Sequence, residues 1–414
     1  MSGLALGIDV GTSGIRVAAL DREARVAGMA ACAMDEAGAD RRAPETWRTA
    51  LGTALNRLWA ELDPGRVAAV AVDGTSGTLL GLDRMGAPVG GALMYNDAVD
   101  DPDIPARIGR LAPRDSAAHG ASSGLARALV LKDRPGVVRI VHQADWIASL
   151  LTGMPMPCDE SNALKTGYDP VARAWPGWIG ELGLAGLLPE VIPVGAVSGA
   201  CSGAFGLPEG AVTVAGLTDG CASFLATGAS RPGEGVTALG TTLVLKLMSD
   251  APVFAPEYGI YSHRIGDVWL AGGASNTGGG VLADVFSPDR IEALSKRIDP
   301  ETDSGLDYYP LSRPGERFPI SDPALAPLLE PRPEDDAAFL KGLLEGIARI
   351  EALGYRRLAE LGAPPLARLF TVGGGARNPV WTAMRARITG AELAEPASDA
   401  AAVGVARLAL GALA

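Results

Sequence analysis

Short runs of apolar residues, many of them β-branched, alternate along the chain with longer stretches in which apolar residues recur at helical spacing. The short runs predict strands at residues 3–8, 16–20, 67–72, 212–216 and 368–372. The longer stretches predict helices at residues 44–62, 134–153 and 333–361, and further helices that open at Asp219 and near Pro379. Residues 154–207 read as a loop-rich region. Alternation of this kind predicts an α/β fold.

Two segments share one pattern: an apolar run, a turn of glycine and hydroxyl residues, and a second apolar run. The first is GIDVGTSGIRVAALD, from Gly7, and the second is VTALGTTLVLKLMS, from Val236. Their likeness indicates an internal duplication. Because 414 residues exceed one ordinary core, we expect two domains. The boundary is predicted near residue 226, giving an N-terminal domain of residues 1–226, which a helix at 400–414 can complete, and a C-terminal domain of residues 227–399.

Composition narrows the class of protein. Hydrophobic residues make up 48% of the chain and charged residues 20%, as in a soluble globular protein. The net charge of −12 argues against a nucleic-acid surface, which needs basic patches. No apolar run is long enough to span a membrane, and no basic leader opens the chain. The four scattered cysteines show no zinc or disulfide spacing, so we expect core cysteines and a cytoplasmic protein.

The turns of glycine and hydroxyl residues suit phosphate. Phosphate needs several converging N–H donors, and glycine allows the backbone to approach it closely. An aspartate there would repel phosphate unless a cation lay between them, so Asp9 suggests a bound Mg²⁺ held through water. A plain hairpin turn remains the alternative for this stretch alone.

Other nucleotide and hydrolase signatures are disfavoured. The chain has no Gly-Lys pair, which excludes a P-loop. Residues 233–238 fit a GxGxxA pattern, but they precede a strand instead of joining a strand to a helix. Three histidines leave few possible bases for a Ser-His-Asp hydrolase.

Five motifs occur in order along almost the whole chain: GIDVGTSGIRVAALD, VDGTSGT, GLTDGCASFLATGA, GEGVTALGTTLVLKL and FTVGGGARNPVWTAMRARITG. Together they resemble the FGGY family of carbohydrate kinases, within the superfamily that also holds actin and the heat-shock chaperone ATPases. The segments MYND, QADW, NALKTGYDP and SGLDYYP are similar to the D-ribulose kinases of the small ketopentose branch, which also includes xylulokinases.

The resemblance implies an α/β fold of two ribonuclease-H-like domains, with sugar and nucleotide in a cleft between them. ATP would lie mainly on the second domain and the sugar on the first. Asp9 would hold Mg²⁺. The resemblance further implies phosphate contacts for two turns, with ATP-binding residues Gly11, Thr12, Ser13, Gly240, Thr241, Thr242 and Gly278.

Asp219 matches the catalytic base of the family's G-x-x-D-x-x-A pattern. It follows a predicted strand and opens a helix, whose positive N-terminus keeps a carboxylate ionised and able to accept a hydroxyl proton. A helix-capping aspartate is the structural alternative. For the adenine ring we expect Gly374, Gly375, Asn378 and Trp381, although a core position is the alternative for Trp381.

The sugar site is predicted at Asp9, Asp219 and the residues that follow the strand at 67–72, namely Asp73, Thr75 and Ser76. The family's W-x-D-x-R pattern is replaced here by Met94-Tyr95-Asn96-Asp97, so Tyr95 and Asn96 are cleft candidates and buried structural roles are their alternative. Lys165 is a further candidate, with a surface lysine as the alternative.

The resemblance thus implies an ATP- and Mg²⁺-dependent kinase that phosphorylates a hydroxyl of a ketopentose. The expected sugar is D-ribulose, and the expected acceptor is O5, the terminal hydroxyl that the family usually phosphorylates. The alternatives are a xylulokinase or other polyol kinase, a catalytically weak regulator that binds ATP and sugar, and an ATPase of the chaperone or actin type. We expect a monomer or homodimer with no nucleic-acid or membrane partner.

Overall fold

The computed structural model describes residues 3–413, and its internal contacts divide the chain into two compact units. The first comprises the described residues up to Ala226, together with His263–Gly266 and those from Ala400 onward. The second comprises Thr227–Ser262 and Asp267–Asp399. Which unit binds which ligand stays a prediction.

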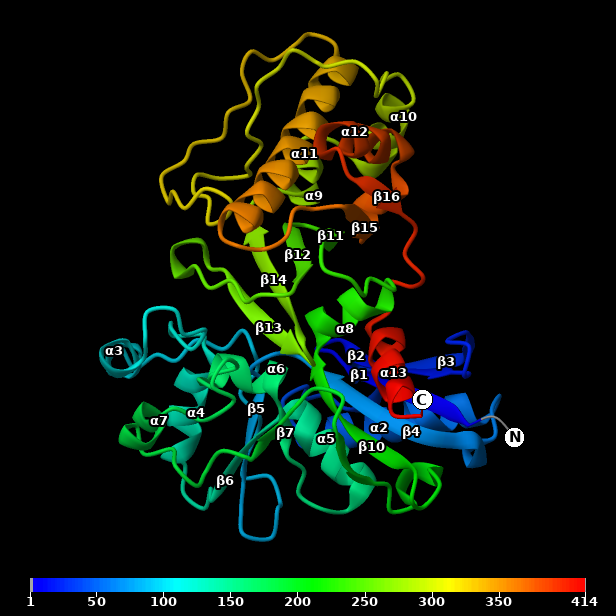
Figure 1. Ribbon diagram of the computed structural model, residues 1–414, viewed down its shortest axis with the longest axis vertical. Coiled ribbons are helices and arrows are strands. Elements are labelled where there is room, and N and C mark those ends of the chain that lie inside the picture. The colour runs from blue at the N-terminus through cyan, green and yellow to red at the C-terminus, as the bar shows by residue number, and fades with distance from the viewer. Residues whose placement is uncertain (1–2, 414) are drawn as a thin grey trace. The chain divides into compact units, whose positions relative to one another are not determined.

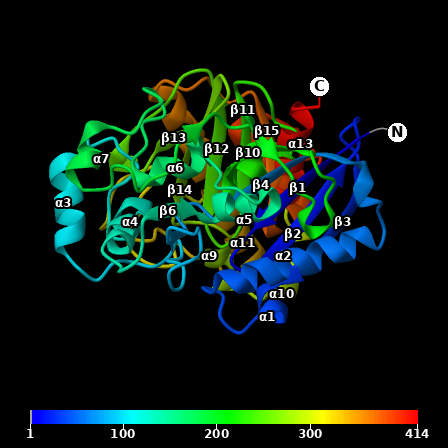
Figure 2. The same cartoon turned by 90° about the horizontal axis from the view of Figure 1, so that it is seen from below.

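A six-stranded sheet organises the first unit, with the strand order β3-β2-β1-β4-β10-β9. Its strands are β1 (Leu4–Val10), β2 (Gly14–Leu20), β3 (Val26–Ala33), β4 (Val67–Gly74), β9 (Val197–Ala200) and β10 (Val212–Thr218). β1 is antiparallel to β2 and parallel to β4, and β4 is parallel to β10. Figures 1 and 2 show β4 lying between β1 and β10. β1 and β4 read as continuous apolar runs because both faces of the sheet are covered.

Two helices cover opposite faces of this sheet. α2 (Pro44–Trp59) shares a core with Leu6 and Ile8 of β1, whereas α13 (Ala401–Gly411) meets Gly7 between them. Successive side chains of a strand point to opposite faces, so this alternation places the helices on either side. A Cβ on Gly7 would lie 2.0 Å from the Ala402 carbonyl oxygen, which shows how closely α13 approaches the strand. Distant ends of the chain therefore build one layered core.

The remaining elements of the first unit are shorter. They include α8 (Asp219–Ala226), which packs on α13, and the antiparallel pair β5 (Leu79–Leu82) and β6 (Arg139–His142). The helices are α1 (Met34–Ala37), η1 (Pro64–Arg66), α3 (Asp103–Leu111), α4 (Gly124–Lys132), α5 (Gln143–Thr152), α6 (Glu160–Ala163), η2 (Leu164–Thr166), α7 (Gly177–Glu181) and η3 (Ala204–Gly206). β7 (Cys158–Asp159) pairs in parallel with β8 (Val191–Ile192).

The second unit is built on a sheet with the order β13-β14-β12-β11-β15-β16. Its strands are β11 (Glu234–Leu239), β12 (Leu243–Ser249), β13 (Tyr261–Ile265), β14 (Val268–Ser275), β15 (Arg368–Val372) and β16 (Glu392–Ala394). Its helices are η4 (Pro256–Tyr258), α9 (Gly279–Ala283), α10 (Pro288–Ser295), α11 (Asp336–Glu360), η5 (Gly374–Arg377) and α12 (Pro379–Thr389). The long helix α11 shares its buried face with β12 and with α12.

The two sheets share a topology. In each, a hairpin continues into a third antiparallel strand, and the first strand of the hairpin pairs in parallel with a later strand: β1 with β4, and β11 with β15. Both hairpins predicted from the repeated pattern form, and they occupy equivalent positions. The internal duplication indicated by the sequence is therefore visible in the strand order.

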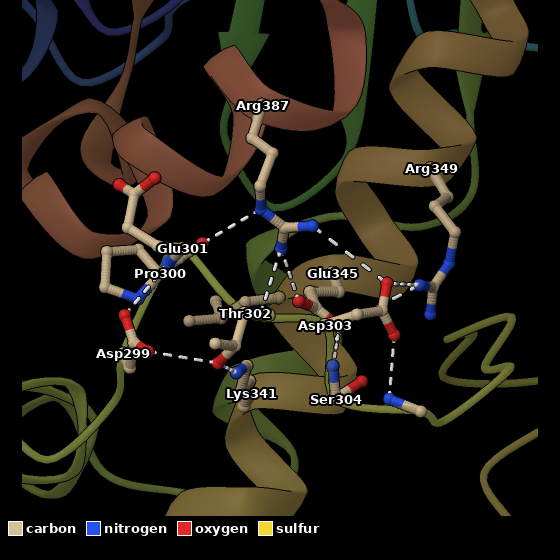
Figure 3. Close-up of polar contacts among 12 residues, drawn as sticks. Asp299, Pro300, Glu301, Thr302, Asp303, Ser304, Lys341, Glu345, Arg349 and Arg387 are labelled. Atoms are coloured by element: carbon tan, nitrogen blue, oxygen red, sulfur yellow. Dashed lines mark hydrogen bonds and ion pairs between the residues drawn. The ribbon is translucent and has the colours of Figure 1, made fainter.

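A polar network fastens the loop before α11 to two helices of the second unit (Figure 3). The fully buried Glu345 of α11 accepts hydrogen bonds from the Arg387 guanidinium of α12 at 2.6 Å and from the Ser304 amide at 2.9 Å. Arg387 also donates to the carbonyl oxygens of Pro300 and Thr302. The network fixes α12, which begins directly after the predicted nucleotide-binding glycines.

One predicted helix differs from the structure. Residues 134–153 were expected to be helical throughout, but a turn at 133–136 is followed by β6, and helix α5 begins only at Gln143. Ile140 and Val141, just before His142, are β-branched and both buried, which favours the strand that pairs with β5. Among residues 3–413, no helix combines the length and the apolar character that a bilayer crossing needs.

Candidate active site

A pocket of about 450 Å³ opens in the first unit, at the ends of several strands of its sheet. Its walls come from the β1–β2 turn, the segment after β4, the start of α8 and the start of α13. The lining residues are Asp9, Gly11, Thr12, Ser13, Arg16, Thr75, Ser76, Tyr95, Lys165, Asp219, Ser223 and Ala401. Most residues predicted from the first-domain motifs are thus gathered in one place.

Parallel pairing brings three aspartates to one edge of the sheet. Asp9 on β1 lies opposite Asp73 on β4, and Asp73 lies opposite Leu217 on β10, two residues before Asp219. Carboxyl ends of parallel strands meet at the same edge, and ligands of open α/β sheets bind there. Of these three, Asp9 and Asp219 line the pocket and offer carboxylate oxygens suited to a cation or to sugar hydroxyls.

Asp73 lies beneath the pocket and does not line it. Its side chain is fully buried, and no donor among residues 3–413 reaches either carboxyl oxygen. Burial, together with the charges of Asp9 and Asp219, raises the pKa of Asp73 well above its usual range. In its neutral form the carboxyl group can donate to Asp9. The predicted sugar contact of Asp73 is therefore replaced by a supporting position behind Asp9.

Asp219 is the first residue of α8, as the sequence predicts. Its Oδ1 accepts a hydrogen bond of 2.7 Å from the Gly220 amide, and the residue lines the pocket. The helix N-terminus favours the ionised carboxylate. Ser223, one turn later, lines the same wall.

Arg16 adds positive charge that the sequence reasoning did not include. Its guanidinium lies 3.3 Å from Asp9 Oδ2 and 3.3 Å from Ser13 Oγ. In the otherwise buried strand β2 it is the one exposed position. A charged residue inside an apolar strand is a signal that could have identified it. An arginine between an aspartate and a hydroxyl turn suits a phosphate group, which it can contact with two donors.

The turn at 94–97 is held against the pocket by Arg127 of α4. This buried guanidinium donates to the carbonyl oxygens of Gly77 at 2.8 Å, Tyr95 at 3.0 Å and Asp97 at 2.9 Å. Burial lowers the pKa of Arg127 to about 10, so it remains charged at neutral pH. One side chain therefore ties the segment after β4 to the turn that carries Tyr95.

Of the residues predicted to bind sugar near this turn, some line the pocket and one does not. Tyr95 lines the pocket and is 46% exposed, and Lys165 of η2 also reaches it. Asn96 is exposed and lies outside the pocket wall. Thr75 and Ser76 line the pocket, and the Ser76 hydroxyl has no hydrogen-bond partner among the described residues. An unpaired buried hydroxyl in a pocket wall is suited to a polyol ligand.

In the second unit, the predicted phosphate segments lie together. The Gly279 and Gly280 amides donate to the carbonyl oxygens of Gly240 at 2.8 Å and Thr241 at 3.0 Å, so α9 begins against the β11–β12 turn. Gly278 has φ +146°, and a Cβ there would lie 2.7 Å from the Thr241 carbonyl oxygen. Only glycine fits this position. Gly240, Thr241, Thr242 and Gly278 thus form one compact cradle.

The glycine turn after β15 packs against the end of β11, which leads into the same cradle. A Cβ on Gly375 would lie 2.8 Å from both the Leu239 Cβ and the Trp381 ring. A Cβ on Gly374 would have the Arg377 guanidinium as its neighbour, at 3.8 Å. These glycines allow the close backbone approach that the sequence predicts for a nucleotide.

Asn378 and Trp381 have structural roles. The Asn378 side chain caps α12 by accepting from the Val380 and Trp381 amides at 3.1 Å, and its amide donates to Ser295. Trp381 is 2% exposed within the core, and its indole N–H donates to the Leu344 carbonyl oxygen at 3.0 Å. The core alternative for Trp381 is therefore favoured over a contact with adenine.

Ala401 lines the pocket although it lies far from Asp219 in the sequence. No local pattern could have identified it, because α13 reaches the first unit only through tertiary packing. Ser223 could have been identified, because residues four apart on a helix share a face.

Similarity to known proteins agrees with the geometry. Residues 235–413 match the model of the FGGY family of carbohydrate kinases, C-terminal domain. A xylulose kinase of Streptomyces coelicolor is 28% identical over 99% of this chain and 88% of its own length. A gluconokinase of Bacillus licheniformis is 27% identical over 52% of this chain and 47% of its own length.

Solved structures share the fold. The crystal structure of a xylulose kinase from Rhodospirillum rubrum superimposes with a TM-score of 0.85 at 20% identity, covering 99% of this chain and 90% of that one. The predicted α/β fold of sugar kinases is confirmed. With its C-terminal family match and the five ordered motifs, this chain is similar to carbohydrate kinases of the FGGY family.

Proposed function

We propose that this protein transfers the γ-phosphate of ATP to a hydroxyl of a ketopentose, with D-ribulose as the substrate and O5 as the acceptor. The observation that carries the proposal is the pocket in which Asp219, Asp9 and the hydroxyls after β4 line one wall. A proton acceptor, a possible cation ligand and polyol-binding groups are what such a transfer requires.

In the proposed reaction, the Asp219 carboxylate accepts the proton of the attacking sugar hydroxyl. The Ser76 hydroxyl and Tyr95 hold the sugar, and Arg16 and Ser13 contact the transferred phosphate. For the glycine cradle of the second unit, the proposed role is to bind phosphate groups of the nucleotide.

The donor set also fits Mg²⁺. Asp9 offers carboxylate oxygens in the pocket wall, and oxygen ligands held partly through water are what Mg²⁺ prefers. When bound, Mg²⁺ offsets the charge of the phosphate oxygens. Behind Asp9, burial and the charges of Asp9 and Asp219 raise the pKa of Asp73, which favours its neutral form.

Xylulose is the second candidate substrate. The Streptomyces coelicolor relative that spans nearly the whole chain carries the name xylulose kinase. The turn Met94–Asp97 replaces the tryptophan and arginine of the larger family's pattern, and this replacement supports D-ribulose.

The test is a coupled assay of ADP release with Mg-ATP and a panel of D-ribulose, D-xylulose, L-ribulose, L-xylulose, gluconate, ribitol and glycerol. A clear preference in kcat/KM for D-ribulose supports the proposal. Preference for another sugar leaves a kinase and overturns the substrate. Binding of ATP without sugar-stimulated ADP release favours the regulator, and fast sugar-independent release favours an ATPase.

A further inference from the structure

A buried cluster in the first unit lies apart from the residues that line the proposed sugar pocket. His142, the last residue of β6, has its Nδ1 3.2 Å from Asp145 Oδ2 and 3.2 Å from Cys158 Sγ. All three side chains are at least nine-tenths buried, and their three ligand atoms lie within 4.8 Å of one another. An imidazole nitrogen, a carboxylate oxygen and a sulfur thus converge on one point.

Hydrogen bonds account for part of this convergence, because Asp145 Oδ2 also accepts from the His142 amide at 3.2 Å where α5 begins. Nδ1 carries either one proton or one lone pair, yet it faces the carboxylate oxygen and the sulfur at the same distance. Cys158 Sγ also lies 3.2 Å from the Asp159 carbonyl oxygen, which is the acceptor its proton would use. A cation at the centre would satisfy all three groups at once.

The other nitrogen of His142 is positioned as in metal-bound histidines. Nε2 lies 3.0 Å from Thr166 Oγ1, and Thr166 is fully buried. If Nε2 carries the proton and donates it to Thr166, the lone pair of Nδ1 faces the cluster. Such an outer hydrogen bond fixes the tautomer and ring orientation of a metal-bound histidine.

Three buried carboxyl groups surround the cluster. Asp145 faces His142, Asp159 accepts from the backbone and side-chain amides of Asn162 at 2.7 Å, and Glu160 pairs with Arg173 at 2.8 Å. Glu160 Oε2 has no hydrogen-bond partner among the described residues. Buried carboxylates are stable when paired or bound to a cation. A divalent ion at the cluster would add positive charge to this carboxylate-rich site.

A pocket of about 280 Å³ lies next to the cluster. Asp145 and Trp146 line it, as do Met85 and Met154, which are 90% and 66% exposed. An ion could enter here, and a water molecule could take a fourth coordination position.

We propose that His142, Asp145 and Cys158 form a binding site for a divalent cation of the zinc class. Nitrogen, sulfur and one carboxylate oxygen are the ligands of Zn²⁺ and Co²⁺, whereas Mg²⁺ takes oxygen ligands alone. The ion joins the start of α5 to β7 and, through Thr166, to the turn that carries Lys165. Its role is structural, and the proposal does not depend on which sugar is phosphorylated.

The first experiment uses the wild-type protein after removal of metals with a chelator. Titration with Co²⁺ should produce a thiolate-to-cobalt band in the near ultraviolet and the visible bands of a tetrahedral site. Both signals should saturate at about one ion per chain. Added Zn²⁺ should abolish both bands, and Mg²⁺ should not. A wild-type titration without a saturable thiolate band overturns the proposal and leaves a network held by hydrogen bonds alone.

Variants assign the site. Cys158→Ser should lose the thiolate band, and Thr166→Val should keep the band but bind Co²⁺ about 10–100-fold more weakly. Cys201→Ser is the matched control, because Cys201 is also a buried thiol of this unit but lies outside the cluster. If the band survives in Cys158→Ser, or is lost in Cys201→Ser, the assignment to this cluster is wrong. Thr166→Val keeps the test decisive if Cys158→Ser fails to fold.

Discussion

Asp219 is the first residue of α8, and it also lines the pocket that contains Asp9. A helix-opening aspartate that served only as a cap would not need the second property. The residue is therefore where the proposed chemistry can be tested most directly.

Asp219→Asn should lower kcat by about 10²–10⁴-fold, because the amide cannot accept the hydroxyl proton. Steady-state kinetics with the preferred sugar measure this loss, and thermal unfolding should show a folded protein. Asp103→Asn is the matched control, since Asp103 is the first residue of helix α3 and lies outside the pocket wall. A kcat close to that of the wild type would remove Asp219 from the role of base.

Asp97 gives a prediction for pH. Its carboxylate pairs with Arg42 and accepts from the Met94 amide at 2.8 Å, and the hydrogen bond from Arg42 is the main reason that the pKa of Asp97 is lowered. A lowered folded-state pKa stabilises the protein above the unfolded pKa of about 4, and the stabilisation is lost as the pH falls through the folded value.

Asp97→Asn should therefore reduce the free energy of unfolding by about 1 kcal/mol at pH 7, and this difference should shrink toward pH 3. Urea denaturation at several pH values measures it. Asp83→Asn is the control, because Asp83 accepts from the Met85 and Ala87 amides in a similar turn without an arginine partner among the described residues. A difference that is constant with pH would contradict the ionic contribution.

At the scale of elements, the small residues of α13 decide how closely it packs. A Cβ on Gly404 would lie 1.8 Å from the Ala222 carbonyl oxygen of α8, whereas a Cβ on Gly411 would have no neighbour within 4 Å. The same substitution at two positions of one helix therefore separates packing from helix propensity.

Gly404→Ala should cost about 2–3 kcal/mol of unfolding free energy, because α13 must move away from α8. Gly411→Ala should change it by less than about 1 kcal/mol, in the stabilising direction, because alanine favours helix. Chemical denaturation of both variants decides the matter. Equal effects at the two positions would show that the close approach does not limit stability.

The elements also show which inferences a sequence supports. The hairpin turns and the start of α8 could be predicted because glycine, hydroxyl and capping residues act locally. Trp381 could not be placed, since a core position and a ring-stacking position use the same residue type. Asp73 follows an apolar strand, which is where a sugar-binding residue is expected. Its burial becomes visible only when β4 is placed between β1 and β10. Residues 134–153 were mistaken for one helix because a short run of apolar residues fits the periodicity of a buried strand as well as that of a helix.

At the scale of the whole molecule, the chain leaves the first unit after Ala226, contributes His263–Gly266 to it, and returns to it for α13. Within the second unit the two crossing segments are adjacent, because the Ala397 amide donates to the Thr227 carbonyl oxygen at 2.9 Å. A short linker can therefore replace the intervening chain.

Residues 1–227 joined by a short glycine linker to residues 397–414 should unfold in one cooperative thermal transition. Residues 1–227 alone should not, because the sheet face around Gly7 would lose its covering helix. Circular dichroism of the two chains, with heating, makes the comparison. Cooperative unfolding of the shorter chain at the same temperature would show that α13 is dispensable.

The position of α13 also has a consequence during synthesis. The ribosome makes the strands of the first unit before the second unit, but the helix that covers one face of them is made only after the second unit. Throughout translation of the second unit, that apolar face remains without its partner, which is the condition under which nascent chains recruit chaperones or aggregate. The first unit is thus completed only after the second unit has been made.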